Sequence, residues 1–379
     1  MDMNEETLPN ATIIQLEAKE QSHPFKFTGK AGEYFGIWIV NLFLSIITLG
    51  IYSAWAKVRK KRYFYGNTWV ADSNFEYHGQ PIAILKGRII AVCALAIYSG
   101  AGYFSPKLGQ GILLILGLLA PWLIARSMAF NAYNSSYRQI RFHFKAGYQD
   151  VLLAIWPFIL IVLIAYLMPG FDPEQVTKIT PGEIAGMLIP TVVGLLAFPY
   201  VMGAIKRLYI SHSKYGGAPW VFSARIAQFY KLYIIALGIL IVGIAVIGLA
   251  IFISTFSPLI GVPAIFFAYL YFGALFFGYI NSRVTNLTFN SAILDDQVSF
   301  SSTLLAGRLA RIYLLNLLAI VFTFGLMIPW AAIRVARYRA ECLTLKSATD
   351  LNAFVSKIGQ DVGATGEEMG EFFDVDLSL

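Results

Sequence analysis

Two asparagines, Asn41 and Asn316, lie inside long apolar runs of the chain. An amide group in hydrocarbon is costly unless it makes hydrogen bonds, so each of these side chains needs a partner. The partner could be a substrate on a polar pathway through the membrane, or a neighbouring helix. The pair is therefore a candidate either for a substrate pathway or for helix packing.

A threonine and a glycine follow each asparagine at the same spacing, as Thr48 with Gly50 and as Thr323 with Gly325. In transporters with discontinuous helices, such breaks expose backbone carbonyls to a substrate or an ion. Glycine is also common in ordinary packing between membrane helices. These four residues therefore share the two interpretations given for the asparagines.

A third group of residues could bind anionic lipid headgroups. Trp55, Trp122 and Trp330 are each followed after four residues by arginine and after eight by tyrosine or phenylalanine, which places the three side chains on one helix face. At the end of a membrane helix, the indole would lie at headgroup level and the guanidinium just beyond it. The candidate contacts are Trp55, Arg59, Lys60, Lys61, Arg62, Tyr63, Trp122, Arg126, Trp330, Arg334, Arg337 and Tyr338. The alternative is that the cations only set the topology.

Most of these residues belong to an internal repeat with a constant offset of 275. The recurring identities are Asn41/Asn316, Thr48/Thr323, Gly50/Gly325, Trp55/Trp330, Arg59/Arg334, Arg62/Arg337 and Tyr63/Tyr338. Pro199, Tyr200 and Lys206 form a weaker copy of the end of this unit. Short segments in which aromatic and other residues alternate follow each unit, at 75–77, 142–144, 221–222 and 298–300, and another at 25–27 precedes the first. Alternation of this kind is typical of a short strand or an interfacial loop.

The composition indicates a membrane protein, because 57% of the residues are hydrophobic and only 13% are charged, against about 25% in soluble domains. Eight apolar runs are long enough, some marginally, for a membrane helix: 34–56, 88–105, 110–125, 151–169, 184–205, 233–254, 259–280 and 312–333. We predict an all-α polytopic membrane protein of about eight membrane-embedded helices in repeated units, with short aromatic-rich interfacial loops.

The long basic loops are predicted to be cytoplasmic, because cations concentrate on that side of a membrane. The runs 34–56 and 312–333 leave one question open. If each crosses the membrane, there are eight crossings, and the segment at 25–27 lies on the side opposite to its relatives. If each turns back near its Thr-x-Gly sequence, both of its ends stay on one side. We expect eight crossings.

Three parts of the chain differ in charge. We predict an acidic, flexible tail at 1–22, a basic, repeated multi-pass domain at 23–346, and a second acidic, flexible tail at 347–379. The basic domain favours anionic membrane lipids as partners, rather than nucleic acid. The spacing of the four histidines and two cysteines indicates neither a metal site nor a cofactor, and no familiar catalytic signature is present.

The segment from His23 onward, with HPFKFTGKAGEYF and then VNLFLSIITLGIYSAWAKVRKKRYFYGN, resembles the YjgN-like family of bacterial inner-membrane proteins of unknown function. The similarity extends to about Cys342. Ala54 departs from the pattern, since proline stands at the related positions 121 and 329. The resemblance implies a multi-pass protein of the bacterial inner membrane and implies no activity.

Repeated membrane units with paired amides lead us to expect a transporter or channel for a small molecule or lipid. A structural, envelope-organising protein that binds anionic lipid and partner proteins is the alternative. A membrane enzyme of unknown chemistry is the third candidate.

Overall fold

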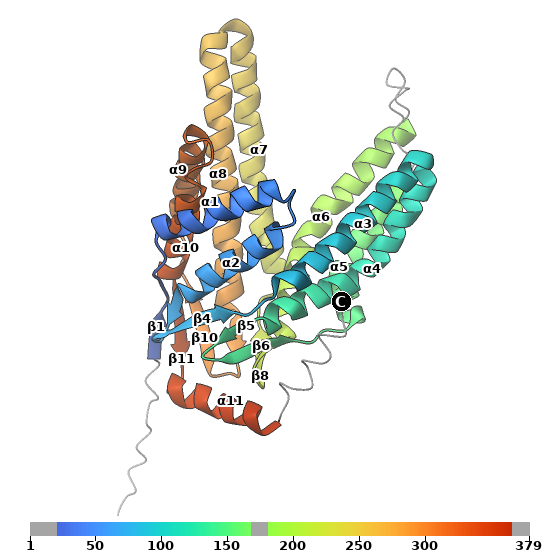
Figure 1. Ribbon diagram of the computed structural model, residues 1–379. Coiled ribbons are helices and arrows are strands. Elements are labelled where there is room, and N and C mark those ends of the chain that lie inside the picture. Colours follow the sequence, from blue (N-terminus) through green and yellow to red (C-terminus); the bar gives the residue numbers. More distant parts are fainter. Residues whose placement is uncertain (1–20, 168–180, 366–379) are drawn as a thin grey trace, which may run out of the picture.

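The protein is a bundle of membrane helices that stands on a closed ring of short strands, seen in the computed structural model of Figure 1. The structure describes residues 21–167 and 181–365. The helices are α1 (Ala31–Ile47), α2 (Ser53–Gly66), α3 (Pro81–Phe104), α4 (Pro106–Tyr133), α5 (Tyr148–Leu167), α6 (Pro181–Ser211), α7 (Ile226–Phe256), α8 (Pro258–Asn290), α9 (Ala306–Phe322), α10 (Ile328–Glu341) and α11 (Leu351–Thr365). The first ten lie on one side of the ring, and α11 lies on the other (Figure 1).

The strands form one 11-stranded antiparallel sheet with the order β1-β11-β10-β9-β8-β7-β6-β5-β4-β3-β2. They are β1 (Gln21–Pro24), β2 (Lys26–Phe27), β3 (Thr68–Val70), β4 (Ser73–Tyr77), β5 (Ser135–Tyr137), β6 (Ile140–Phe144), β7 (Ser213–Tyr215), β8 (Ala218–Phe222), β9 (Ala292–Leu294), β10 (Val298–Ser302) and β11 (Leu343–Ser347). The two ends of this order, β1 and β2, are separated only by Phe25, so the sheet closes on itself. Closure leaves no open edge on which another chain could add a strand.

Five equivalent units make up this ring in the part of the chain that the structure describes. Each unit has an entry helix (α1, α3, α5, α7 or α9), an exit helix (α2, α4, α6, α8 or α10) and a following hairpin. Four hairpins are continuous in sequence. The fifth joins β11 to β1, with β2 continuing the strand to β3, so it is built from segments at opposite ends of the described chain.

One backbone hydrogen bond recurs in all five units. The N–H three residues before each entry helix donates to the carbonyl of the residue that follows the exit helix. The pairs are Thr28 to Asn67 (3.0 Å), His78 to Asn134 (2.8 Å), Lys145 to His212 (3.0 Å), Ser223 to Ser291 (3.0 Å) and Thr303 to Cys342 (2.9 Å). We call these bonds the foot ties, because each joins the two ends of one helix pair and satisfies a carbonyl that the helix leaves free.

The all-α prediction is wrong in one respect, because the expected aromatic loops are the strands of this sheet. Tight turns make the hairpins possible. Ala71 and Asp72 connect β3 to β4 with φ values of 45° and 57°, and Arg138 and Gln139 connect β5 to β6 with φ values of 49° and 65°. Positive φ at both central residues is characteristic of two-residue hairpin turns. Neither turn contains glycine, so the sequence gives little sign of them.

The runs 34–56 and 312–333 are each broken into two helices, α1 with α2 and α9 with α10. After α1, Leu49 has a φ of 50°, and the Gly50 N–H donates to the Ser45 carbonyl at 2.7 Å. Phe324 and Gly325 repeat this geometry after α9, with a bond of 2.8 Å from Gly325 to Ile320. This hydrogen-bonding pattern ends a helix and reverses the chain.

The expected eight crossings are not confirmed. Five helices, α3, α4, α6, α7 and α8, are long and apolar enough to span a membrane among the residues described, and α1 and α5 are shorter apolar helices. The foot ties hold both ends of α1–α2 and of α9–α10 at the ring, as they do for the other three helix pairs. Multi-pass character itself is confirmed.

Part of the expected C-terminal tail is folded. The helix α11 packs against the ring through Leu351, Phe354, Val355 and Ile358. Residues 1–20 and 366–379, to which the rest of the two tail predictions applies, lie outside the described residues.

The turn after α1 gives a stability prediction. Gly50→Ala places a side chain at a φ of 91° and should lower the stability of the folded protein by about 1–2 kcal/mol, seen as a lower melting temperature in detergent. Gly36→Ala is the matched control, because Gly36 lies within α1 and an added Cβ meets nothing within 4 Å. The control should be neutral or stabilising. Equal effects of the two changes would contradict this account of the turn.

Candidate functional site

A chamber of about 850 Å³ extends from between the exit helices into the interior of the strand ring. Aromatic side chains form a large part of its walls in the ring, among them Phe25, Phe75, Phe142, Tyr215, Trp220 and Phe300. Three pairs of these rings are in contact. Their centroid distances are 5.2 Å for Phe142–Tyr215, 6.2 Å for Phe25–Phe75 and 5.7 Å for Trp220–Phe300. The ring interior is therefore a continuous apolar surface of the kind that holds a small ligand.

Three cations, Lys60 on α2, Lys206 on α6 and Arg339 on α10, line the chamber where the helices meet the ring. We call them the cationic collar. Ala54, Pro199 and Pro329 occupy the same position in the repeat. Lys60 follows Ala54 by six residues, Lys206 follows Pro199 by seven, and Arg339 follows Pro329 by ten. Four residues of helix rise span about 6 Å, so the backbone positions of the three residues lie at similar heights along their helices.

No acidic residue belongs to the chamber wall in the described parts of the chain. Within those parts, no carboxylate lies within ion-pair distance of the collar, and Arg339 donates only to the neutral Asn281 and Tyr313, at 3.5 and 3.3 Å. Lys60 and Arg339 are exposed and Lys206 is partly buried, so the collar presents hydrated cations without carboxylate partners to an anion in the chamber.

The far mouth of the ring is closed by α11, whose buried residues Leu351, Phe354 and Val355 also line the chamber. Arg138, in the turn between β5 and β6, connects this helix to the ring. Its guanidinium donates to the Asn352 side chain on α11 at 2.8 Å and to the Ala71 carbonyl of the neighbouring hairpin at 2.7 Å. The helix therefore forms a floor beneath the chamber, as its place under the strands shows (Figure 1).

Two tyrosines connect neighbouring hairpins inside the ring. The Tyr137 hydroxyl donates to the Val70 carbonyl and the Tyr215 hydroxyl donates to the Tyr137 carbonyl, both at 2.9 Å. Burial raises the pKa of both hydroxyls, so they remain protonated donors at neutral pH. The chamber wall therefore carries no negative charge from these groups.

The amides, threonines and glycines predicted from the sequence lie outside the chamber, in the hairpins α1–α2 and α9–α10. The Asn316 side chain donates to the Ala331 carbonyl at 3.3 Å, while the buried Asn41 oxygen has no hydrogen-bond partner. The Thr48 hydroxyl donates to the Leu44 carbonyl at 2.7 Å and accepts the Tyr52 N–H at 2.9 Å.

Thr323 repeats these threonine bonds with Ala319 and Met327, at 2.6 and 3.2 Å. With Gly50 and Gly325, the two threonines shape the turns, and Asn316 joins the two helices of its hairpin.

The basic cluster of α2 is divided among several environments. Lys60 faces the chamber, Lys61 contacts the Asn131 side chain and lies 4.5 Å from the centre of the Tyr77 ring, and Arg62 donates to the Gly79 carbonyl at 3.5 Å. Arg59 donates to the Tyr52 hydroxyl at 3.0 Å.

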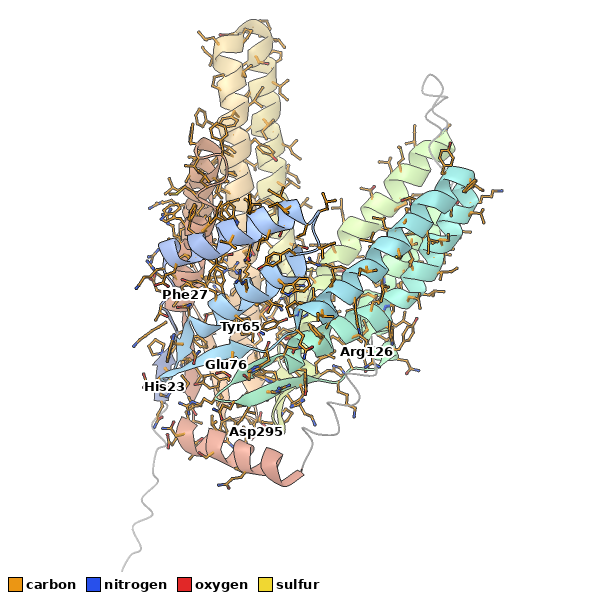
Figure 2. All side chains as sticks on the ribbon, viewed as in Figure 1. His23, Phe27, Tyr65, Glu76, Arg126 and Asp295 are labelled. Carbon is orange, nitrogen blue, oxygen red and sulfur yellow. The ribbon has the colours of Figure 1, made fainter. Side chains whose placement is uncertain are left out.

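The other predicted lipid contacts fall into three places. The Tyr63 hydroxyl accepts the Lys30 N–H at 2.8 Å, and Trp55 stacks on Tyr52 with their ring centres 6.0 Å apart. Trp122 is 44% exposed on α4, and Arg126 lies on that side of the molecule (Figure 2), away from α9 and α10. Trp330, Arg334, Arg337 and Tyr338 line a second cavity between α1, α9 and α10.

Sequence reasoning missed Arg339 and α11, and it noted Lys206 only as part of a weak repeat copy. The available signal for Lys206 was its repeat position, since it stands seven residues after Pro199 as Lys61 stands after Ala54. No cluster of three or more potential metal ligands occurs among the residues the structure describes. The histidine contacts with acids are pairs, such as His212 with Asp150 at 3.6 Å.

The fold and the chamber define a class of multi-pass membrane protein in which helix pairs stand on a closed antiparallel sheet. The chain matches the family described as "Bacterial protein of unknown function (DUF898)" over residues 22–372, and it belongs to that family.

Its curated relatives include two proteins called Inner membrane protein YjgN. The relative from Salmonella typhimurium strain LT2 is 27% identical over 181 residues, which cover 46% of this chain and 44% of the relative. The relative from Escherichia coli K12 is 27% identical over 208 residues, which cover 50% and 48%. The chain thus spans about half the length of the relatives it matches. No solved structure matches it. The predicted family and inner-membrane location are confirmed.

The docking of α11 gives a prediction that separates the floor from the rest of the fold. Phe354→Ala removes a side chain that is 5% exposed and should weaken the docking of α11 by about 3–5 kcal/mol. Limited proteolysis should then cut within 348–365 at much lower protease concentration. Ser356→Ala, on the exposed face of the same helix, should leave the cleavage rate unchanged. An unchanged rate for both variants would show that α11 does not depend on this contact.

Proposed function

We propose that this protein binds an amphipathic anion in its chamber and transports it, taking it from the membrane. The ligand class is an acyl chain that carries a carboxylate or a phosphate. The observation that carries the proposal is the cationic collar, which stands without a described carboxylate partner directly above an aromatic ring interior.

The two parts of such a ligand match the two parts of the chamber. The aromatic walls would take the chain, because burying apolar surface stabilises binding by about 25 cal/mol per Å². Lys60, Lys206 and Arg339 would bind the head, since charge-assisted hydrogen bonds are stronger than neutral ones. The volume of about 850 Å³ is within the usual range for a small-molecule site, roughly 300–1,000 Å³.

The membrane is the most direct source of this ligand. The residues of α6 and α8 that line the chamber belong to helices long and apolar enough to cross a bilayer, while the ring lies beyond their ends. The collar is therefore placed near the boundary between lipid and water, where the head of an amphipath lies. Passage through the ring would require α11 to move, because it closes the far mouth.

A structural role in the membrane is the second candidate. Lys57 and Arg59 are exposed on α2, and Trp122 is exposed on α4, so these side chains are free to contact anionic headgroups. Such a role would not depend on the chamber. Variants of the collar therefore distinguish the two functions.

The binding step can be tested with purified protein in nanodiscs and a fluorescent long-chain fatty acid as the probe. Lys60→Gln combined with Lys206→Gln should weaken binding about tenfold or more, because two of the three collar charges are removed. The methyl ester of the probe should bind weakly to every variant. Lys57→Gln is the matched control, since Lys57 lies one turn before Lys60 and does not line the chamber.

The transport step needs a separate measurement in sealed vesicles. The protein should move the fatty acid across the vesicle membrane faster than the uncatalysed rate, and the double collar variant should lose this increase. Binding without flux would limit the function to a carrier or sensor. Equal affinity of the wild type and the double variant for the probe would refute the proposal.

A further inference from the structure

A second cavity, of about 630 Å³, lies between the first turn of α1 and the hairpin α9–α10. Four arginines line it, Arg308 and Arg311 from α9 and Arg334 and Arg337 from α10, against one acid, Glu341. We call it the arginine pocket. It shares none of its lining residues with the chamber.

Aromatic rings hold two of these guanidinium groups in place. The Arg308 guanidinium lies 4.7 Å from the centre of the Tyr338 ring, and the Arg334 guanidinium lies 5.1 Å from Trp330. Stacking on a ring uses the face of a guanidinium and leaves its N–H groups in the plane available to donate. One Arg334 N–H donates to the Asn316 side-chain oxygen at 3.4 Å, which leaves the others for a ligand. Such an arrangement suits the oxygens of a phosphate.

The acidic partner in the pocket does not neutralise this charge. Glu341 lies 3.9 Å from Arg308, and both side chains are more than half exposed, so the pair is weak. Arg311 has no hydrogen-bond or ion-pair partner among the residues described. Arg308 and Arg311 also lie in the first two turns of α9, where positive charge opposes the helix dipole.

The equivalent place in the first unit has a different charge. At the offset of 275, Glu33 stands in place of Arg308 and Gly36 in place of Arg311. Glu33 is paired with Lys30 at 3.3 Å. Since the first unit reaches the same topology without these arginines, orienting the hairpin does not require them.

The position of the pocket indicates the source of its ligand. The tip of the α9–α10 hairpin is apolar and open to lipid, with Phe322 77% exposed and Phe324 98% exposed. The arginine pocket lies at the other end of the same hairpin, close to the ring. A hairpin whose tip lies in hydrocarbon places its base at the level of the headgroups.

We propose that the arginine pocket is a binding site for the phosphate group of an anionic phospholipid. Arg308 and Arg311 bind the phosphate oxygens from α9, and Arg334 binds them from α10. Arg337 borders the site, while its guanidinium donates to the Gly29 carbonyl at 3.3 Å and joins α10 to the segment before α1. A bound lipid would therefore connect the last unit of the ring to the first. This site is independent of the chamber and of the function proposed for it.

The site can be tested with the full-length protein in a neutral detergent, with short-chain phosphatidylglycerol as the probe and short-chain phosphatidylcholine and inorganic phosphate as comparisons. Arg308→Gln combined with Arg311→Gln should weaken phosphatidylglycerol binding about tenfold or more. Arg283→Gln is the control, because Arg283 is also an exposed arginine next to a tyrosine ring but does not line the pocket, and it should change the affinity less than about twofold. Since the chamber is proposed to take the same class of lipid, the comparison is repeated in the background of Lys60→Gln with Lys206→Gln, where the two arginine changes should still weaken phosphatidylglycerol binding about tenfold.

Arg308 and Arg311 are exposed, so the double variant should melt at the wild-type temperature without lipid. Wild-type affinity of this variant for phosphatidylglycerol would overturn the proposal. Phosphatidylcholine binding as tight as that of phosphatidylglycerol would overturn the requirement for an anion. Inorganic phosphate binding as tight as the lipid would assign the pocket to a free anion and overturn its assignment to a lipid.

Discussion

The five foot ties are the constraint on which the rest of the molecule depends. Each fixes both ends of a helix pair at the same level of the ring, whatever the length of the helices between them. The tied residues are 39 positions apart in the first and last units, at Thr28–Asn67 and Thr303–Cys342, and farther apart in the other three. The fold therefore combines a regular base with a bundle of unequal height, as Figure 1 shows. Among the described residues, helices long enough to reach across the bilayer occur only in the three middle units.

The two candidate sites both arise from differences between units that share one backbone plan. The cationic collar exists because only some exit helices carry a basic residue toward the chamber. The arginine pocket exists because the last entry helix has two arginines where the first has a glutamate and a glycine. The repeated backbone plan forms the closed ring and its cavity. The sequence differences among the units place the positive charges of the two sites.

Much of the architecture could be predicted from the sequence, and the remainder depends on contacts that leave little local trace. The repeat offset of 275 and the aromatic segments predicted the units, because each unit uses the same residues at the same structural positions. The breaks after α1 and α9 were uncertain because Leu49 and Phe324, which hold the left-handed conformation, are as apolar as the helices around them. The sheet was obscured because its strands are only two to five residues long and pair with other units.

The sites were harder to predict than the fold. Asn41 and Asn316 attracted attention because they are polar within apolar runs, yet Asn316 bonds within its own helix pair. Lys60, Lys206 and Arg339 are separated by well over 100 residues in sequence, and their convergence follows only from closure of the ring. The contribution of α11 was hidden because its apolar residues, such as Phe354, are spaced along a segment with an acidic composition.

The fifth hairpin has a consequence for the order in which the protein acquires its shape. His23 in β1 pairs with Leu345 in β11, so ring closure requires two strands that are synthesised more than 300 residues apart. The first four hairpins and β2 can pair with their neighbours as the chain emerges, while β1 has no partner until β11 is made. The long loop that must close makes this last pairing slow. The ring interior therefore becomes a sealed compartment only after synthesis has passed β11, and a chain interrupted before that point carries an open sheet at the membrane surface.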